Sequence, residues 1–285
     1  MTPPAPSGPL RTAAGRFGAA LVLAAALLAI GGGALALCPG LFNSRCDPER
    51  VNLSFGAINQ PPGSWPHLLG TDDQGRDCLA RLAAGSVRTL GTSVGAVALS
   101  AAIGIPAGLL AGFFRGFGDR LLSRLTEIAM AFPALVLAIA IVTALGPSLA
   151  SVAVAAGLTG APSFMKLARG QVMVEAQREY VTAARALGLS PGRILARQIA
   201  PNVLAPLVAL ATLSLGTSIL EIAGLGFLGL GVAPGVPEWG TDVSLARNQF
   251  LTAPWTILVP GAAISASVLG FNLLGDALQK RPRGG

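Results

Sequence analysis

Long hydrophobic stretches separated by short polar segments make up most of this 285-residue chain. Five of them reach the roughly 20 residues that a helix needs to cross a bilayer core of about 30 Å, and a sixth is slightly short. Polar and hydrophobic residues do not alternate within them, and lipid offers the backbone no hydrogen-bond partners, so we predict helices throughout. The expected fold is an all-α polytopic membrane protein with about six transmembrane helices, at residues 17–37, 89–114, 125–145, 149–165, 203–223 and 255–274.

The polar segment 172–202 lies between two of these stretches and must leave the lipid. It begins with a helix predicted over about 172–187. Glu179 lies early in this helix and Arg185 late, which suits the helix dipole. The spacing i, i+3, i+4, i+7 predicts one narrow apolar face, made of Tyr180, Ala183, Ala184 and Leu187.

A stop signal and a second helix follow. Gly188 occupies the position at which a helix C-terminus favours a left-handed residue. Ser190 and Pro191 then provide an N-cap and a first helical residue, so a short helix is predicted from Pro191 to about Ala200, ending before Pro201. The resulting helix-turn-helix either docks into a groove on a partner or only connects two spans, and its shape alone does not choose.

The positive charges indicate the orientation of the chain. If the N-terminus is inside, fourteen of the twenty lysines and arginines fall on the cytoplasmic side. Since positive residues favour cytoplasmic loops, both termini and segment 172–202 are expected in the cytoplasm. The net charge of +7 is spread between the spans rather than over one soluble face, so nucleic acid is not an expected partner.

This topology predicts five regions along the chain. They are a disordered cytoplasmic tail (1–16), the first span (17–37), an extracytoplasmic loop ending in a short interfacial helix (38–88), a core of five spans that includes loop 172–202 (89–279), and a second tail (280–285). Cys38 and Cys46 fall in the outer loop, where they either form a disulfide or stay free thiols.

Two features inside the predicted spans suggest specific roles. Gly104, Gly108 and Gly112 recur every four residues and give the second span a smooth face for helix packing. Glu221 lies deep in the fifth span, where a charge is costly and faces protein or water. It is either a structural hydrogen-bonding group or part of the lining of a transport route, and both interpretations stay open.

No pattern of catalytic or metal-binding residues accompanies these spans. Residues 91–95 match GxSxG and residues 224–229 match GxGxxG, but neither follows a strand, as hydrolase and dinucleotide sites require. We interpret 224–229 as a flexible outer connector. With one histidine and no phosphate-binding loop, the chain is expected to have no enzyme activity, cofactor or metal, so any use of ATP must come from a partner.

Segment 179–202 resembles the EAA loop of the inner-membrane permease subunits of binding-protein-dependent ABC importers. Ala183, Ala184, Gly188 and Pro201 stand in register with that motif, whereas Thr182 replaces its glutamate and the isoleucine and leucine positions also differ. Further segments resemble the dipeptide, oligopeptide and nickel transport subfamily, at residues 69–82, 126–133, 221–231, 237–240 and 253–276.

The resemblance implies a permease subunit of the cell inner membrane that performs no catalysis. It implies three kinds of partner: a second, usually non-identical permease subunit, two cytoplasmic ATPase subunits and an external solute-binding protein. Coupling to the ATPases would involve Glu179, Tyr180, Ala183, Ala184, Leu187, Gly188 and Pro201.

The expected function is to form half of the pathway for di- or oligopeptides, with nickel, glutathione or another small solute as alternatives. An ion-gradient-driven secondary carrier is the alternative from a different class. That class is expected to show internal repeats and several deep acids, whereas this chain shows no repeat and only Glu221.

Overall fold

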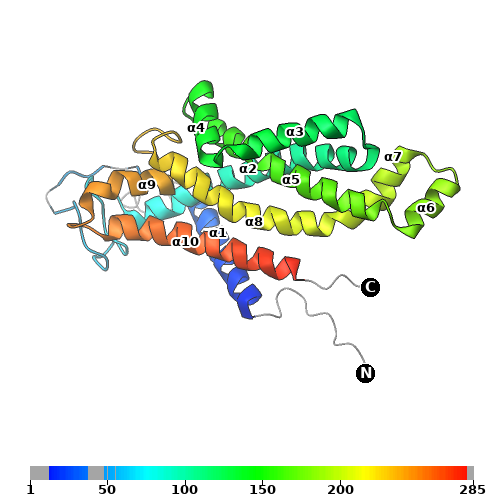
Figure 1. Cartoon of the computed structure of the whole chain (residues 1–285). Helices are drawn as coiled ribbons and strands as arrows, with labels where there is room; N and C mark the ends of the chain where they lie inside the picture. Colours follow the sequence, from blue (N-terminus) through cyan, green and yellow to red (C-terminus); the bar gives the residue numbers. More distant parts are fainter. Residues whose placement is uncertain (1–12, 38–47, 50, 55, 281–285) are drawn as a thin grey trace.

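The computed structural model describes residues 13–37, 48–49, 51–54 and 56–280 (Figure 1). Cys38 and Cys46 lie outside the described residues, as do most of the two predicted tails. The described part is built from helices, with only two isolated β-bridges in the outer loop. The helices are α1 (Ala13–Leu37), α2 (Cys78–Phe114), α3 (Phe117–Ala131), α4 (Ala134–Leu145), α5 (Leu149–Glu175), α6 (Glu179–Ala186), α7 (Pro191–Ile194), α8 (Ala200–Phe227), α9 (Trp239–Ala246) and α10 (Trp255–Gln279).

The predicted all-helical membrane fold is confirmed. Among the described residues, four helical segments are long and apolar enough to cross a membrane: Ala13–Gly33, Cys78–Phe114, Pro191–Phe227 and Trp255–Gln279. The bent pair α3 and α4 raises this number to five if it counts as one span. The predicted stretch 149–165, which is slightly short for a span, lies within α5, and α5 continues to Glu175. The number of six spans and the cytoplasmic position of the termini stay predictions.

The predicted third span, 125–145, is not one straight helix. It is divided between α3 and α4, which meet at an angle of 96°. Phe132 has extended backbone angles and Pro133 precedes the first residue of α4. Proline has no amide hydrogen, and it pushes the residue before it out of the helical region. The hydropathy pattern showed a continuous apolar stretch, but the local backbone chemistry breaks it.

The predicted interfacial helix before the second span is instead the first part of α2. This helix begins at Cys78 and runs for 37 residues, so no break separates the interface from the span. The Asp77 side chain caps it by accepting a hydrogen bond from the Ala80 amide at 2.8 Å. The polar residues of its first turns are buried against α9 and the outer loop rather than lying on a membrane surface.

Helices α2 and α5 pack closely along a glycine face. A Cβ atom on Gly104 or Gly108 would lie 2.4 Å from the carbonyl oxygen of Ala161 or Met165, and one on Gly112 would lie 2.7 Å from that of Arg169. The three glycines therefore bring the two backbones together where any side chain would hold them apart. Gly116, the next member of the repeat, ends this contact and precedes α3.

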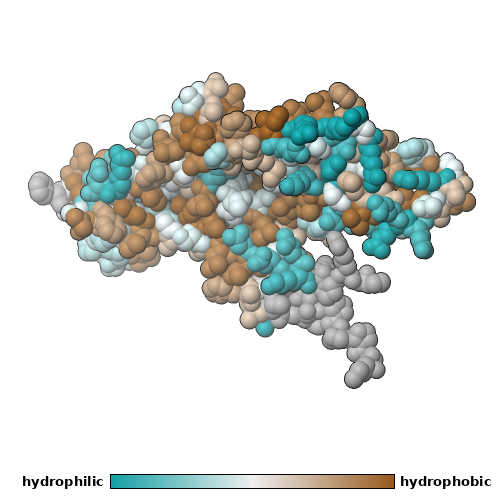
Figure 2. Space-filling view, in the orientation of Figure 1, coloured by the Kyte–Doolittle hydropathy of each residue, from teal (hydrophilic) through white to brown (hydrophobic). Residues whose placement is uncertain are grey.

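The ends of the molecule differ in character. The α6–α7 segment lies at one end of the long helices and α9 with the outer loop at the other (Figure 1). Gly18 of α1 contacts Gly270 and Leu273 of α10, so the start of α1 and the end of α10 lie side by side. In Figure 2, hydrophobic surface covers much of the middle, and hydrophilic residues gather toward the end that carries α6 and α7.

Candidate functional site

The coupling unit, residues 176–199 between α5 and α8, does not start as predicted. Instead of one helix over 172–187, α5 ends at Glu175, a turn follows, and α6 begins at Glu179. Arg178 is extended there, with φ −68° and ψ 147°. The local sequence favours helix throughout, and the break is fixed by tertiary contacts that turn α6 back toward α8.

A hydrophobic cluster anchors the coupling unit to the long helices. Val181 and Ala184 of α6 and Ile194 of α7 are buried together with Val172 of α5 and Val203 of α8. These buried apolar contacts hold α6 and α7 against both α5 and α8. The unit is therefore packed onto the ends of α5 and α8 rather than attached as a loose loop.

Three members of the predicted apolar face are exposed, and one is buried. Ala184 points into the protein beside Val181, whereas Tyr180, Ala183 and Leu187 are exposed, Leu187 to 80%. α6 packs Val181 and Ala184 into the buried cluster, and this packing leaves the other three members of the predicted face outside it. Glu179 and Thr182 are also exposed.

Gly188 ends α6 in the conformation that the sequence predicts. Its φ is +76°, in the left-handed region that glycine favours. The Leu189 amide donates to the Ala184 carbonyl at 3.2 Å and the Gly188 amide to the Arg185 carbonyl at 3.0 Å. This pair of bonds is the Schellman motif, which closes the helix end and sets the direction of the chain into α7.

The second helix begins at Pro191 as predicted but does not stop before Pro201. α7 passes through a π-helical turn, Leu195–Ile199, directly into α8. Pro201 lies in the first turn of α8, where a proline needs no amide partner. Buried Ile199 and Val203 on either side hold this continuous path against the same cluster. The local stop signal was therefore overridden by packing.

Tyr180 joins the two halves of the coupling unit through its hydroxyl. It donates to Glu175 Oε1 at 2.7 Å and accepts from Asn202 Nδ2 at 3.0 Å, and Asn202 also donates to the Gln198 carbonyl at 2.7 Å. Partial burial, together with the bond to the Glu175 carboxylate, raises the pKa of Tyr180, so the hydroxyl keeps its proton. The ends of α5, α6 and α8 are thus linked by polar bonds as well as by apolar packing.

Glu221 borders a polar cavity between α2, α5 and α8. Its Oε1 accepts a hydrogen bond from the Thr159 hydroxyl of α5 at 3.0 Å. The cavity has a volume of about 80 Å³, and Ser100, Ser163, Thr217 and Ser218 contribute hydroxyl groups to its wall. Helix α8, which bears Glu221, is continuous with the coupling unit, and α5 bears its partner Thr159.

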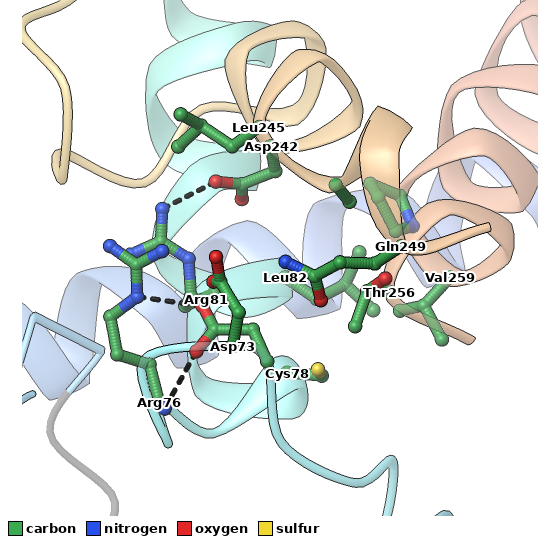
Figure 3. A pocket seen from close by; sticks show the side chains of 13 residues that line it. Asp73, Arg76, Cys78, Arg81, Leu82, Asp242, Leu245, Gln249, Thr256 and Val259 are labelled. Carbon is green, nitrogen blue, oxygen red and sulfur yellow. Dashed lines mark hydrogen bonds and ion pairs between the residues drawn. The ribbon is translucent and has the colours of Figure 1, made fainter. Parts of the chain in front are cut away.

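A second polar cluster, drawn in Figure 3, lies where the outer loop, the start of α2 and α9 meet, at the end of the molecule opposite the coupling unit (Figure 1). Arg81 of α2 pairs with Asp242 of α9, and Arg76 Nε pairs with Asp72 Oδ2 at 2.6 Å. Burial raises the pKa of Asp242 to about 6, even though Arg81 acts to lower it. The space between these groups is only about 30 Å³, room for a water molecule and not for a larger solute. The Arg81–Asp242 pair fastens α9 to α2, and the Arg76–Asp72 pair lies within the outer loop.

Sequence reasoning missed the role of Glu238 at this end. Its side chain is 1% exposed and accepts hydrogen bonds from the Thr89 hydroxyl at 2.8 Å, the Gly240 amide at 3.0 Å, and the amide and hydroxyl of Thr241 at 2.8 and 3.0 Å. Gly226 of α8 lies so close that an added Cβ would meet Glu238 Oε2 at 2.2 Å. The usable signal was an acidic residue just before a short helix, where it caps the first turn. Residues 224–229, predicted as a flexible connector, instead form the end of α8 and its turn.

The sequence is similar to a known family of transport proteins and to several of its members. Residues 104–284 match the family described as binding-protein-dependent transport system inner membrane component. The dipeptide transport system permease protein DppC of Alkalihalophilus pseudofirmus is 45% identical over 76% of this chain and 71% of its own length. The di/tripeptide transport system permease protein DppC of Pseudomonas aeruginosa is 45% identical over 84% and 81%, and the glutathione transport system permease protein GsiD of Pectobacterium atrosepticum is 38% identical over 80% and 75%.

The fold has a solved counterpart. A chain of the MetNI methionine ABC transporter, in an inward-facing conformation, aligns with 69% of this chain and 93% of its own length at a TM-score of 0.58 and 20% identity. The family match decides against the alternative of a secondary carrier. The chain therefore belongs to the inner-membrane components of binding-protein-dependent transport systems, the multi-pass permease subunits of ABC importers.

Proposed function

We propose that this subunit forms half of the translocation pathway for di- or oligopeptides and that it catalyses no reaction itself. Two relatives at 45% identity carry names that refer to dipeptides and to di- and tripeptides. A relative named for glutathione, itself a peptide, is 38% identical and makes glutathione the second candidate solute. ATP hydrolysis is assigned to separate subunits, because no phosphate-binding loop is present in the sequence.

The coupling unit is the proposed docking site for one of two cytoplasmic ATPase subunits. The observation that carries this proposal is the combination of an exposed apolar surface, at Tyr180, Ala183 and Leu187, with a rigid buried anchor. A short helix that offers side chains to a groove while fixed to long helices can transmit a displacement. A second permease subunit, non-identical to this one, and an external solute-binding protein complete the proposed complex.

The proposed mechanism links the two ends of α5 and α8. Closure of the ATPase pair on ATP would displace the coupling unit and the adjacent ends of α5 and α8. Further along, these two helices are joined by the hydrogen bond between Thr159 and Glu221. Because packed helices move as bodies rather than bend smoothly, this displacement would open the pathway to one side of the membrane at a time. Glu221 would then line the route. The subunit contributes shape and motion, and the bond-breaking step takes place in its partners.

Cysteine crosslinking tests the docking site. In a cysteine-free background of the full complex, Leu187→Cys is expected to crosslink to the ATPase subunit with a yield that changes when ATP is added. Leu251→Cys is the matched control, since Leu251 is 92% exposed but lies beyond α9, away from the coupling unit. Equal crosslinking at both positions, or none at Leu187 in a complex that still transports solute, would contradict the proposal.

Uptake into proteoliposomes tests the solute class. The complex with its binding protein is expected to accumulate a labelled dipeptide or tripeptide when ATP is supplied on the ATPase side, without any ion gradient. Unlabelled glutathione and Ni²⁺ serve as competitors. Accumulation of labelled glutathione, without accumulation of the labelled dipeptide or tripeptide, would select the second candidate.

A further inference from the structure

One face of α5 is polar although the helix lies among membrane spans. Thr159, Ser163, Lys166 and Gly170 follow one another at i, i+4, i+7 and i+11, which places them on a single face. Ser163, Lys166 and Gly170 are exposed, and Thr159 is half-buried. Ser163 lines the cavity of Glu221 and Thr159 bonds to Glu221, so this face of α5, called here the polar strip, leads from that cavity to Lys166. A polar face at membrane depth meets water, solute or protein rather than lipid.

The positive end of the polar strip is Lys166. Nearby charges are already paired: Arg169 Nε with Asp119 Oδ1 at 2.5 Å, and Glu127 Oε2 with Arg124 Nη1 at 3.1 Å. Lys166 shares a hollow of about 130 Å³ with Glu127 and Arg169, yet it makes no ion pair with any described residue. Its ammonium group is therefore the uncompensated charge of this hollow.

The negative end of the polar strip is Glu221. Its hydrogen-bond partner is a neutral hydroxyl, that of Thr159, and no other charged residue of the described part of the chain lines its cavity. Ser218 lines the same cavity, is 6% exposed, and has no hydrogen-bond partner among the described residues for its buried Oγ. A buried hydroxyl without a partner beside an unpaired carboxylate leaves room for a donor to complete both.

The separation of the two charges follows from helix geometry. Glu221 is fixed to α5 at the level of Thr159, and Lys166 lies seven residues further along. At 1.5 Å per residue, this corresponds to about 10 Å along the helix axis. An extended peptide of three residues also spans about 10 Å, and the flexible lysine stem adapts to a residue more or less.

We propose that Glu221 and Lys166 bind the two charged ends of the transported solute, the ammonium group at Glu221 and the carboxylate at Lys166. The Ser218 hydroxyl oxygen accepts a hydrogen bond from the same ammonium group. The polar strip then selects short zwitterions of two to four residues and disfavours peptides with a blocked end. This inference rests on the proposed peptide transport and adds the site at which the permease recognises its solute.

A cycle that changes both the residue and the solute tests the proposal in the reconstituted complex. Uptake of trialanine, N-acetyl-trialanine and trialanine amide is compared for the wild type, Glu221→Gln and Lys166→Gln. Glu221→Gln is expected to lower trialanine uptake by about tenfold or more, the effect of losing one charge-assisted hydrogen bond, and to affect N-acetyl-trialanine by less than about twofold. Lys166→Gln is expected to lower uptake of trialanine by a similar factor and to leave uptake of trialanine amide nearly unchanged. Preferences of the binding protein cancel, because each ratio compares two permeases with one solute.

Matched controls come from elsewhere in the chain. The other lysine, Lys280, and the exposed Asp276 lie at the end of α10, away from the polar strip. Lys280→Gln and Asp276→Asn should change uptake of all three solutes by the same factor. If Glu221→Gln also lowers all three equally, the carboxylate contacts the second subunit or has a structural role, and the proposal is overturned.

A second measurement avoids the binding protein altogether. Thr217 lines the cavity and is exposed, so a maleimide should label Thr217→Cys in the detergent-solubilised complex. Trialanine is expected to slow this labelling, and Glu221→Gln to abolish the protection. Labelling that is indifferent to trialanine would overturn the site. A wild-type complex that takes up no peptide would instead refute the proposed function, so the two failures are distinguishable.

Discussion

At the scale of single residues, the same chemical group has different tasks according to its neighbours. Glu238 is satisfied by four neutral donors and fastens α9 to α2 and α8, whereas Glu221 has one hydroxyl donor and borders a cavity. Both are carboxylates within or beside membrane helices, and the sequence alone does not separate them. Their hydrogen-bond partners, supplied by other helices, decide which is structural.

Gly108 is expected to be indispensable for the packing of α2 on α5. A Cβ there would lie 2.4 Å from the Met165 carbonyl oxygen and 2.7 Å from the Ala168 Cβ. Gly108→Ala should therefore destabilise the protein by about 1–3 kcal/mol through overpacking. Gly95→Ala, on the same helix with open space around it, should stabilise by about 0.5–1 kcal/mol through helix propensity. In detergent, the melting temperature should fall for Gly108→Ala and rise for Gly95→Ala. Equal shifts in the two variants would refute the packing role of Gly108.

Asp242 is expected to give the outer end of the protein a pH-dependent stability. Its folded pKa of about 6 is above its ordinary value of 3.8, so the folded state binds the proton more tightly than the unfolded state. This contribution is fully present below about pH 4 and is lost as pH rises through about 6. The melting temperature of wild type minus that of Asp242→Asn should therefore be higher at pH 4.5 than at pH 7.5. A difference that does not change with pH would show that the raised pKa is absent.

At the scale of elements, packing overrules several local signals in the coupling unit. The continuous helix favoured by residues 172–187 is broken after Glu175, and the stop signal at Pro201 is passed by a π-helical turn. Both departures bring Val181, Ile194 and Ile199 into one buried cluster. By contrast, Gly188 behaves as the sequence predicts, because the left-handed conformation is a property of the residue itself.

Changing Gly188 is expected to uncouple solute binding from ATP hydrolysis. Gly188→Leu adds a side chain at φ +76°, which costs about 1–2 kcal/mol and favours a different turn between α6 and α7. Gly188→Asn is the control, because asparagine tolerates the left-handed region. The leucine variant should reach the membrane and assemble, but lose most of the solute-stimulated ATPase activity that the asparagine variant retains. Normal stimulation in both variants would exclude a coupling role for this turn.

At the scale of the whole molecule, the long helices carry different chemistry to their two ends. One end holds the coupling unit, and the other holds the ion-paired outer loop and α9 (Figure 1). The positive-inside rule predicts that the first end lies in the cytoplasm. The α5–α8 pair connects both, since it bears the Glu221 cavity between them.

Labelling from each side of the membrane checks this orientation. In a cysteine-free background, Arg185→Cys is expected to react with a membrane-impermeant maleimide only in inside-out vesicles. Leu251→Cys should react only in right-side-out vesicles or intact spheroplasts, because it lies beyond α9 at the opposite end. Reaction of Arg185→Cys from the outer side would reverse the topology and remove the coupling unit from the reach of cytoplasmic ATPases.

The sequence by itself determined the properties that depend on composition and on individual residues. Hydropathy predicted the helical membrane fold, Gly188 the end of α6, Pro191 the start of α7, and the motif register the family. Only the tertiary structure decided where the 125–145 stretch bends, which residues of α6 are exposed, and how the polar strip leads from the cavity of Glu221 to Lys166. The reason is that lipid exposure and backbone preference act on each segment alone, whereas burial and hydrogen-bond partners come from helices distant in the chain.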